Sequence, residues 1–304
     1  MDEQLDCLII GGGPAGLTAA IYLARFHLKI LVADDGKGRA QSIPCTHNLS
    51  GFPDGIGGKA LLGRMREQAQ RYGAEIVDAF VTRLDKVENG FEANWGERPV
   101  AAKAVLLATG VKNRRPPMDE DLHDDALQRG LIRYCPICDG YEVTDKRVGV
   151  IGSDSHGVAE AVFLRSYTPD VTLIAPDKAM RLKAEDSDML KLAGVPCVDG
   201  PARAVAVAQD CIVVETADGT FTFDSVYPAL GSDTHVALAE QLGAELAANG
   251  CLVTDAHQRT GIPGLYAAGD VVLGLDQISH AMGQGGVAAT TIRNDLAKER
   301  PLLR

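Results

Sequence analysis

The sequence predicts an α/β fold in which two three-layer domains share one chain, the second inserted into the first. Three observations predict it. A short apolar strand, a glycine-rich turn and a helix follow one another near the N-terminus, and the same order returns after Lys146. The last part of the chain then adds a short strand and a long helix, as the second half of an interrupted domain would. Units of this kind are Rossmann-like, the type that binds dinucleotides.

The first unit begins with residues 6–10, which are continuously apolar, as is typical of a buried parallel strand. The glycines of 11–16 turn the chain into a helix that we expect over 14–26. Residues 28–33 are the next strand. The pattern is that of a βαβ unit.

The second unit has the same order of elements. Residues 147–151 form its first strand, Gly152 opens the turn, and a helix is expected over 155–167. The following strand is 171–175. Two such units far apart in the sequence favour two nucleotide-binding folds.

The remaining segments complete the two domains. Residues 80–100 and 202–223 alternate apolar and polar positions, which predicts two small antiparallel meanders. Strands at 105–110 and 226–231 follow them, and a long helix starts near Gln277. The predicted boundaries are 1–113 for the first part of the outer domain, 114–230 for the inserted domain and 231–304 for the second part of the outer domain.

Composition narrows the class of protein. The 304 residues are 46% hydrophobic and 23% charged, which is ordinary for a soluble globular protein of two domains. The net charge of -11 argues against nucleic acid or an anionic membrane as the main partner, because both would repel the chain. The N-terminus lacks the basic region of a signal peptide, and no apolar run could cross a bilayer. We therefore expect a cytoplasmic protein.

Seven cysteines indicate redox chemistry rather than a structural framework. Only Cys135 and Cys138 are closely spaced, and no second pair of cysteine or histidine ligands accompanies them, so we expect no metal. Four others lie in apolar stretches and are interpreted as small core residues. These are Cys7, Cys197, Cys211 and Cys251.

The first glycine loop has the spacing that a dinucleotide needs. Gly11 permits the tight turn, Gly13 lets the backbone approach a pyrophosphate, and Gly16 lets the helix pack close to the strand. The start of the helix offers N–H groups and a positive dipole end to the phosphates. Asp34, at the end of the second strand, can accept hydrogen bonds from a ribose.

The two close cysteines have the spacing of a working dithiol. Cysteines three apart on a first helical turn lie on the same side, so their sulfurs can form a disulfide. Pro136 suits the first helical position, and the helix dipole favours thiolates there. Asp139 follows directly and could carry a proton to or from the dithiol.

Four motifs follow one another along nearly the whole chain. They are Gly-Gly-Gly-Pro-Ala-Gly at 11–16, Ala-Thr-Gly at 108–110, Cys-x-x-Cys-Asp-Gly at 135–140 and Ala-Ala-Gly-Asp at 267–270. Their types and order resemble those of the low-molecular-weight, bacterial-type thioredoxin reductases. This resemblance implies a homodimeric FAD enzyme that carries its dithiol in the inserted domain and acts on a thioredoxin-like protein.

The resemblance also implies roles for single residues. Cys138 would face the flavin, Cys135 would exchange with the substrate, and Asp139 would be the acid–base group. Asp270 would bind the ribityl chain of the flavin, and Gln277 would lie close to its ring. The other residues expected to bind FAD are Gly11, Gly13, Pro14, Ala15, Gly16, Asp34, Gln41, Asn48, Thr109, Gly110 and Gly269.

The second glycine loop departs from the family pattern. The middle glycine, where backbone must approach the pyrophosphate of NADPH, is Asp154, whose side chain adds bulk and negative charge. The His-Arg-Arg cluster that holds the 2′-phosphate in the family is absent; Lys178 and Arg181 might substitute only in part. Asp177 could instead serve the ribose of NADH, although Asp154 obstructs NADH equally. NADPH is therefore a doubtful cofactor.

The segments 135–142, 39–41 and 47–48 are similar to a divergent branch of thioredoxin-reductase-like proteins that do not use pyridine nucleotides. That branch includes oxidases of small-molecule dithiols, which pass electrons to oxygen. Other relatives take electrons from ferredoxin or carry a second flavin. Oxygen, ferredoxin or a second flavin is thus a possible electron partner here.

Three histidines remain open. The resemblance places His47 and His280 near the flavin, where each could be a base or a gate, or a structural residue. His156 could bind an anion at the altered second loop.

The sequence therefore favours an FAD-dependent thiol–disulfide oxidoreductase that works through Cys135 and Cys138 without NADPH. A conventional NADPH-dependent thioredoxin reductase is the first alternative. An FAD-binding redox sensor without turnover is the second.

Overall fold

The structure is a computed structural model that describes residues 4–96, 99–177, 179–180 and 182–303. The chain forms two compact units. The first unit contains Met1–Gln41, Gly57–Lys112 and Thr234–Arg304, and the second contains Ser42–Ile56 and Asn113–Asp233. The segment Ser42–Ile56 therefore groups with the second unit, although the predicted boundaries placed it with the outer domain.

The first unit is built on a seven-stranded sheet in the order β3-β2-β1-β6-β5-β4, with β16 also paired to β6. Strands β1, β2, β3, β6 and β16 are parallel, and the meander β4-β5-β6 is antiparallel, as predicted. The elements are β1 (Leu5–Ile10), α1 (Pro14–Arg25), β2 (Ile30–Asp34), η1 (Arg39–Ser42), α2 (Gly58–Arg71), β3 (Glu75–Asp78), β4 (Arg83–Val87), β5 (Gly90–Asn94), β6 (Val100–Leu107), α7 (Ala237–Gln241), β16 (Leu265–Ala267) and α8 (Ile278–Glu299).

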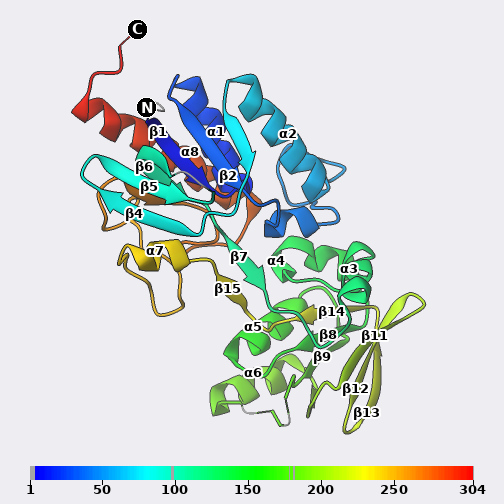
Figure 1. Cartoon of the computed structure of the whole chain (residues 1–304). Helices are drawn as coiled ribbons and strands as arrows, with labels where there is room; N and C mark the ends of the chain where they lie inside the picture. The colour runs from blue at the N-terminus through cyan, green and yellow to red at the C-terminus, as the bar shows by residue number, and fades with distance from the viewer. Residues whose placement is uncertain (1–3, 97–98, 178, 181, 304) are drawn as a thin grey trace. The chain divides into compact units, whose positions relative to one another are not determined.

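Side chains alternate between the two faces of this sheet and make two apolar cores. On β1, Cys7 and Ile9 join the core beneath α1 and α8, whereas Leu8 and Ile10 join the core on the opposite face. Helices α1 and α8 lie side by side on the sheet (Figure 1). Their approach is close because a Cβ on Gly285 would come within 2.3 Å of the Ala15 carbonyl oxygen. Gly285 thus allows α8 to pack directly against the start of α1.

The second unit has a parallel four-stranded sheet in the order β10-β9-β8-β14 and an antiparallel three-stranded sheet β11-β12-β13. A separate pair, β7 (Val111–Asn113) and β15 (Ser232–Thr234), lies at the points where the chain passes between the units. The elements are α3 (Glu120–Gln128), α4 (Pro136–Asp139), η2 (Gly140–Val143), β8 (Val148–Ile151), α5 (Ser155–Leu164), β9 (Val171–Ile174), α6 (Ala184–Ala193), β10 (Cys197–Val198), β11 (Ala204–Ala208), β12 (Cys211–Thr216), β13 (Gly219–Phe223) and β14 (Ser225–Pro228).

Both faces of the four-stranded sheet are covered, as the predicted three layers require. Val148 and Val150 pack beneath α5 and α6, and Ile151 packs beneath the three-stranded sheet (Figure 1). Glycine is needed at position 149 because a Cβ there would lie 2.9 Å from the ring of Phe223 on β13. The fold class predicted from the two glycine loops is confirmed.

The core assignment of the single cysteines holds only in part. Cys7 is fully buried, Cys211 and Cys251 are partly buried, and Cys197 is exposed. The prediction for Cys197 was wrong because it lies on β10, a two-residue edge strand that pairs on one side only, with β9. In the part of the chain that is described, no helix is both long and apolar enough to span a bilayer.

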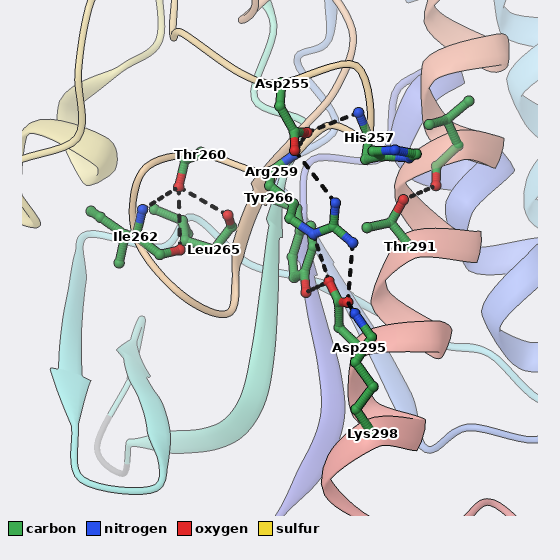
Figure 2. A network of polar contacts seen from close by, with 11 residues as sticks. Asp255, His257, Arg259, Thr260, Ile262, Leu265, Tyr266, Thr291, Asp295 and Lys298 are labelled. Atoms are coloured by element: carbon green, nitrogen blue, oxygen red, sulfur yellow. Dashed lines mark hydrogen bonds and ion pairs between the residues drawn. The ribbon is translucent and has the colours of Figure 1, made fainter.

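A polar network ties the last helix to the loop before β16. The Asp295 carboxylate on α8 accepts two hydrogen bonds from the Arg259 guanidinium, at 2.7 and 3.0 Å, and one from the Tyr266 hydroxyl at 3.0 Å (Figure 2). Lys298 adds a fourth contact at 2.8 Å. These donors hold the pKa of Asp295 below its usual range. Asp255 binds the other side of Arg259.

We predict that Asp295→Asn lowers the melting temperature at neutral pH by about 2–4 °C, equivalent to roughly 1 kcal/mol for partly exposed ion pairs. A carboxyl with a depressed pKa stabilises the fold above its unfolded-state pKa and loses that effect as the pH falls through the folded-state pKa. The difference between the wild type and the variant should therefore shrink on acidification. Thermal unfolding followed by circular dichroism at several pH values measures it; an equal gap at all pH values would contradict the assignment.

Candidate active site

The three glycines of the first loop have different surroundings. Gly11 has a φ of +109°, and a Cβ there would come within 2.2 Å of the Ala108 carbonyl oxygen. Gly16 packs against the Gly11 carbonyl, 2.0 Å from where its Cβ would be. A Cβ on Gly13 would meet open space. The loop therefore leaves its middle glycine accessible at the start of α1, where Pro14 is the first helical residue and no side chain caps the helix. This cradle fits a pyrophosphate.

Asp34 lies at the carboxyl end of β2, as predicted, and is buried. Its Oδ1 accepts a hydrogen bond from the Gly12 N–H at 3.0 Å, and its Oδ2 lies 2.5 Å from the guanidinium of Arg66 on α2. The carboxylate is thus held against the glycine loop. Arg66 could not be predicted from the sequence, because nothing local in α2 marks it as a partner of β2.

Asp270 is the second acidic residue of this unit. Its carboxylate pairs with Arg39 at 2.6 Å, and Arg39 also reaches Asp276 at 3.0 Å. Burial raises the pKa of Asp270, and the Arg39 charge opposes that rise. Gly269, with φ +83°, donates its N–H to Gln284 at 2.8 Å, and a Cβ there would lie 3.0 Å from the Ala15 Cβ. The glycine before Asp270 therefore packs directly on the start of α1.

The other predicted FAD-binding residues lie in the same unit, with one exception. Gln277 is buried at the N-cap of α8. The Thr109 hydroxyl donates to the His235 carbonyl at 2.7 Å, and Gly110 takes a φ of +65°. Gln41 lies on η1, whereas Asn48 belongs to the second unit, where its Oδ1 accepts from the Thr46 hydroxyl at 2.9 Å.

His280 is the one histidine of the open three that lies in the first unit, on α8. A Cβ on Gly274 would come within 2.7 Å of its Nε2, so glycine leaves room for the ring.

The predicted cysteine pair lies in the second unit. Cys135 and Cys138 are joined in a disulfide, with 5.2 Å between their Cα atoms. Cys135 is the N-cap of α4 and Pro136 is its first helical residue. The Cys138 N–H donates to both the Cys135 carbonyl oxygen at 2.9 Å and its Sγ at 3.2 Å. The first turn of the helix therefore places the two sulfurs together.

Asp139 is held by two side chains that the sequence analysis did not identify. Its Oδ2 lies 3.0 Å from the Arg133 guanidinium, and its Oδ1 accepts a hydrogen bond from the Tyr227 hydroxyl at 2.9 Å. Tyr227 is fully buried on β14. Burial raises the pKa of Asp139, while the Arg133 charge and the hydrogen bond from Tyr227 lower it. A carboxyl balanced between these opposing effects can gain and lose a proton beside the dithiol.

The second glycine loop has the close glycine packing of a dinucleotide-binding loop, but a side chain caps the helix that follows it. Gly152 and Gly157 still touch, with a Cβ on either lying 3.0 Å from the Cα of the other. Asp154, however, is the N-cap of α5, and its Oδ1 accepts hydrogen bonds from the N–H groups of His156 and Gly157, both at 3.1 Å. The N–H groups that would face a pyrophosphate thus bind the protein's own carboxylate.

One further carboxylate lies at this helix terminus, and another is paired with His156 within the helix. The Ser155 hydroxyl donates to Asp186 at 2.9 Å, and the His156 Nε2 lies 3.2 Å from the Glu160 carboxylate. That carboxylate raises the pKa of His156. His156 is therefore paired with an acid within its own helix. Lys178 and Arg181, the two residues considered as substitutes for the arginine cluster, lie outside the described residues.

Comparison with known proteins agrees with this geometry. Residues 5–285 match the family of pyridine nucleotide-disulphide oxidoreductases. A thioredoxin reductase of Peptoclostridium litorale is 32% identical, with 95% of this chain and 96% of that protein covered. A thioredoxin reductase of Listeria monocytogenes is 30% identical, with 94% and 92% covered.

Solved structures give the same result. HlmI has a TM-score of 0.89 at 28% identity and covers 98% of this chain and 94% of its own. The thioredoxin reductase of Streptococcus pyogenes has a TM-score of 0.88 at 27% identity, with 98% and 100% covered. An atypical thioredoxin reductase of Desulfovibrio vulgaris, TRi, is 32% identical with a TM-score of 0.56, at 98% and 100% coverage.

Proposed function

Because the chain belongs to the pyridine nucleotide-disulphide oxidoreductase family and is a flavin disulfide oxidoreductase, we propose that it exchanges electrons with a substrate dithiol or disulfide without a pyridine nucleotide. Its working groups are Cys135, Cys138 and Asp139. The observation that carries the proposal is the carboxylate of Asp154, which occupies the N-terminus of α5.

Electrostatic repulsion supports the interpretation that the second loop does not bind a pyrophosphate. A pyrophosphate at α5 would have to displace the Asp154 carboxylate from two N–H groups and then lie beside it. Asp186, which accepts a hydrogen bond from the Ser155 hydroxyl, adds a second carboxylate at the same helix terminus. At a few ångströms, each like-charge pair costs on the order of 1–4 kcal/mol near a protein surface. The first loop carries no such carboxylate on its helix N-terminus.

The chain's own residues would divide the work between the units. The glycine loop at 11–16, together with Asp34, Asp270 and Gln277, would hold FAD, which supplies a two-electron donor and acceptor when bound. Cys135 would exchange with the substrate sulfur, and Cys138 would close or open the disulfide. Asp139, set by Arg133 and Tyr227, would take up or return the thiol proton.

The substrate is proposed as a thioredoxin-like protein or a small-molecule dithiol, and oxygen, ferredoxin or a second flavin as the external electron partner. A homodimer is the proposed assembly. A conventional NADPH-dependent thioredoxin reductase is the second candidate, favoured by the names of the similar Peptoclostridium and Listeria proteins. The two candidates differ in one measurable property, the affinity for NADPH.

We predict that calorimetric titration of the FAD-loaded protein with NADPH or NADH shows no saturable binding below millimolar concentration. Asp154→Gly should strengthen NADPH binding at least about tenfold, because it returns two N–H groups to the phosphates and removes a charge. Ser153→Gly, which leaves the cap in place, is the matched control. Micromolar binding to the wild type would support the conventional reductase instead.

A further inference from the structure

Outside the Cys135–Cys138 disulfide, one free cysteine of the second unit lies beside a histidine and a carboxylate. The Cys45 Sγ is 3.6 Å from the His47 Nε2, and the His47 Nδ1 is 2.9 Å from the Glu142 Oε1. Cys45 is exposed. We propose that Cys45 is a second reactive thiol, which His47 and Glu142 prepare for exchange with a small disulfide.

The backbone places Cys45 and His47 on one side of a short paired segment. Thr46, between them, exchanges two backbone hydrogen bonds with Ile56, at 2.9 and 3.0 Å. In extended backbone, alternate residues point to the same face, so both side chains flank the neighbouring Gly55. A Cβ on Gly55 would come within 2.5 Å of the Cys45 Sγ and 2.6 Å of the His47 ring. Glycine at 55 therefore makes the space in which thiol and imidazole meet.

The carboxylate determines which nitrogen of His47 can act as a base. Glu142 accepts a hydrogen bond, so Nδ1 carries the proton of the neutral ring, and Nε2 presents its lone pair to the Cys45 thiol. A nucleophile, a base and a group that orients the base in this order are the arrangement of activated thiols. Because the thiol and the carboxylate lie on opposite ring nitrogens, they do not converge on one point, and no metal-binding cluster occurs among the described residues.

Glu142 links this group to the dithiol segment. It lies on η2, the turn that directly follows α4, three residues after Asp139. Its side chain is only 24% exposed, and its Oε2 is buried without a hydrogen-bond partner. Glu142 therefore offers a partly buried carboxylate whose one paired oxygen contacts the imidazole.

The proposed exchange balances in atoms and electrons. The Cys45 proton moves to His47 Nε2, and the thiolate attacks one sulfur of the incoming disulfide. The disulfide's S–S bond breaks as the bond from Cys45 forms, and the released thiolate takes the proton back from His47. One disulfide is consumed and one is formed, so no further oxidant is needed. A small disulfide fits best because one side of the Sγ faces Gly55, where a Cβ would come within 2.5 Å of it.

Dipyridyl disulfide, whose released thione is coloured, tests the proposal on the FAD-loaded protein with its Cys135–Cys138 disulfide intact. We expect a fast phase of one thione per chain, assigned to Cys45 by peptide mass spectrometry, that is about 10- to 100-fold faster than the reaction of Cys197. Cys197 is the comparison thiol and belongs to an exposed residue; partial desolvation of its sulfur and the charge of Asp199 raise its pKa.

Variants separate activation from mere exposure. Cys45→Ser should remove the fast phase, and Cys197→Ser should leave it unchanged. His47→Gln should slow it at least about tenfold, because an amide cannot take the proton. His156→Gln is the control for the loss of an imidazole, because His156 pairs with Glu160 elsewhere in the unit. This variant should keep the wild-type rate. The proposal is overturned if Cys45 reacts no faster than Cys197, or if His47→Gln leaves its rate unchanged.

Discussion

Replacing Cys138 by serine is expected to stop reduction of the bound flavin by a dithiol. We propose that a substrate dithiol passes its electrons through the disulfide between Cys135 and Cys138, which serine cannot form. Groups that act as a unit lose nearly the whole effect when one is removed, so we expect the rate to fall about a thousandfold or more. Anaerobic stopped-flow mixing with dithiothreitol, followed in the visible absorbance of the flavin, measures it.

Cys197→Ser is the control for this experiment, since Cys197 is an exposed thiol of the same unit on β10. It should reduce at the wild-type rate. If Cys138→Ser is reduced as fast as the wild type, the dithiol does not carry the electrons, and the FAD-binding redox sensor without turnover becomes the better interpretation.

Asp139→Asn is expected to lower the rate of dithiol oxidation about 100-fold, because general acid–base groups contribute factors of this order. In the wild type the rate should rise with pH as the Asp139 carboxyl loses its proton and becomes able to accept one from a thiol. Burial raises the pKa of Asp139, so this rise should occur above the pH expected for an exposed aspartate. Asparagine has no proton to lose, and its profile should lack the rise.

Arg133 and Tyr227 set the position of that rise. Both lower the pKa of Asp139, so Arg133→Met and Tyr227→Phe should each move it to higher pH. Arg129→Met is the control, because Arg129 pairs with Asp125 and Asp210 rather than with Asp139. A rise that stays in place in both Arg133→Met and Tyr227→Phe would show that Asp139 is not the titrating group.

Much of the fold could be predicted because its signals are local. The apolar run at β1, the glycine loop after it and the helix α1 lie within adjacent residues, and the same holds for β8 and α5. The disulfide was predictable for the same reason, since the spacing of Cys135 and Cys138 on one helical turn determines their distance.

The rest depends on contacts between residues far apart in the sequence. Tyr227 reaches Asp139 from β14, and Arg66 reaches Asp34 from α2; no periodicity marks either residue. The exposure of Cys197 depends on β10 being an edge strand, which its apolar surroundings do not reveal. From the sequence, Asp154 was interpreted only as an obstruction to phosphate. Because aspartate is favoured at helix N-caps, its contact with the start of α5 could also have been predicted.

In the proposed function, electrons reach the flavin and the dithiol without a pyridine nucleotide. Anaerobic mixing of the FAD-loaded protein with excess NADPH, and separately with NADH, tests it most directly. We expect the visible absorbance of the oxidised flavin to persist with either nucleotide and to be lost with dithiothreitol. Rapid and complete loss of that absorbance with NADPH would contradict it, and the Asp154 carboxylate at the start of α5 would then have to yield its N–H groups to the nucleotide.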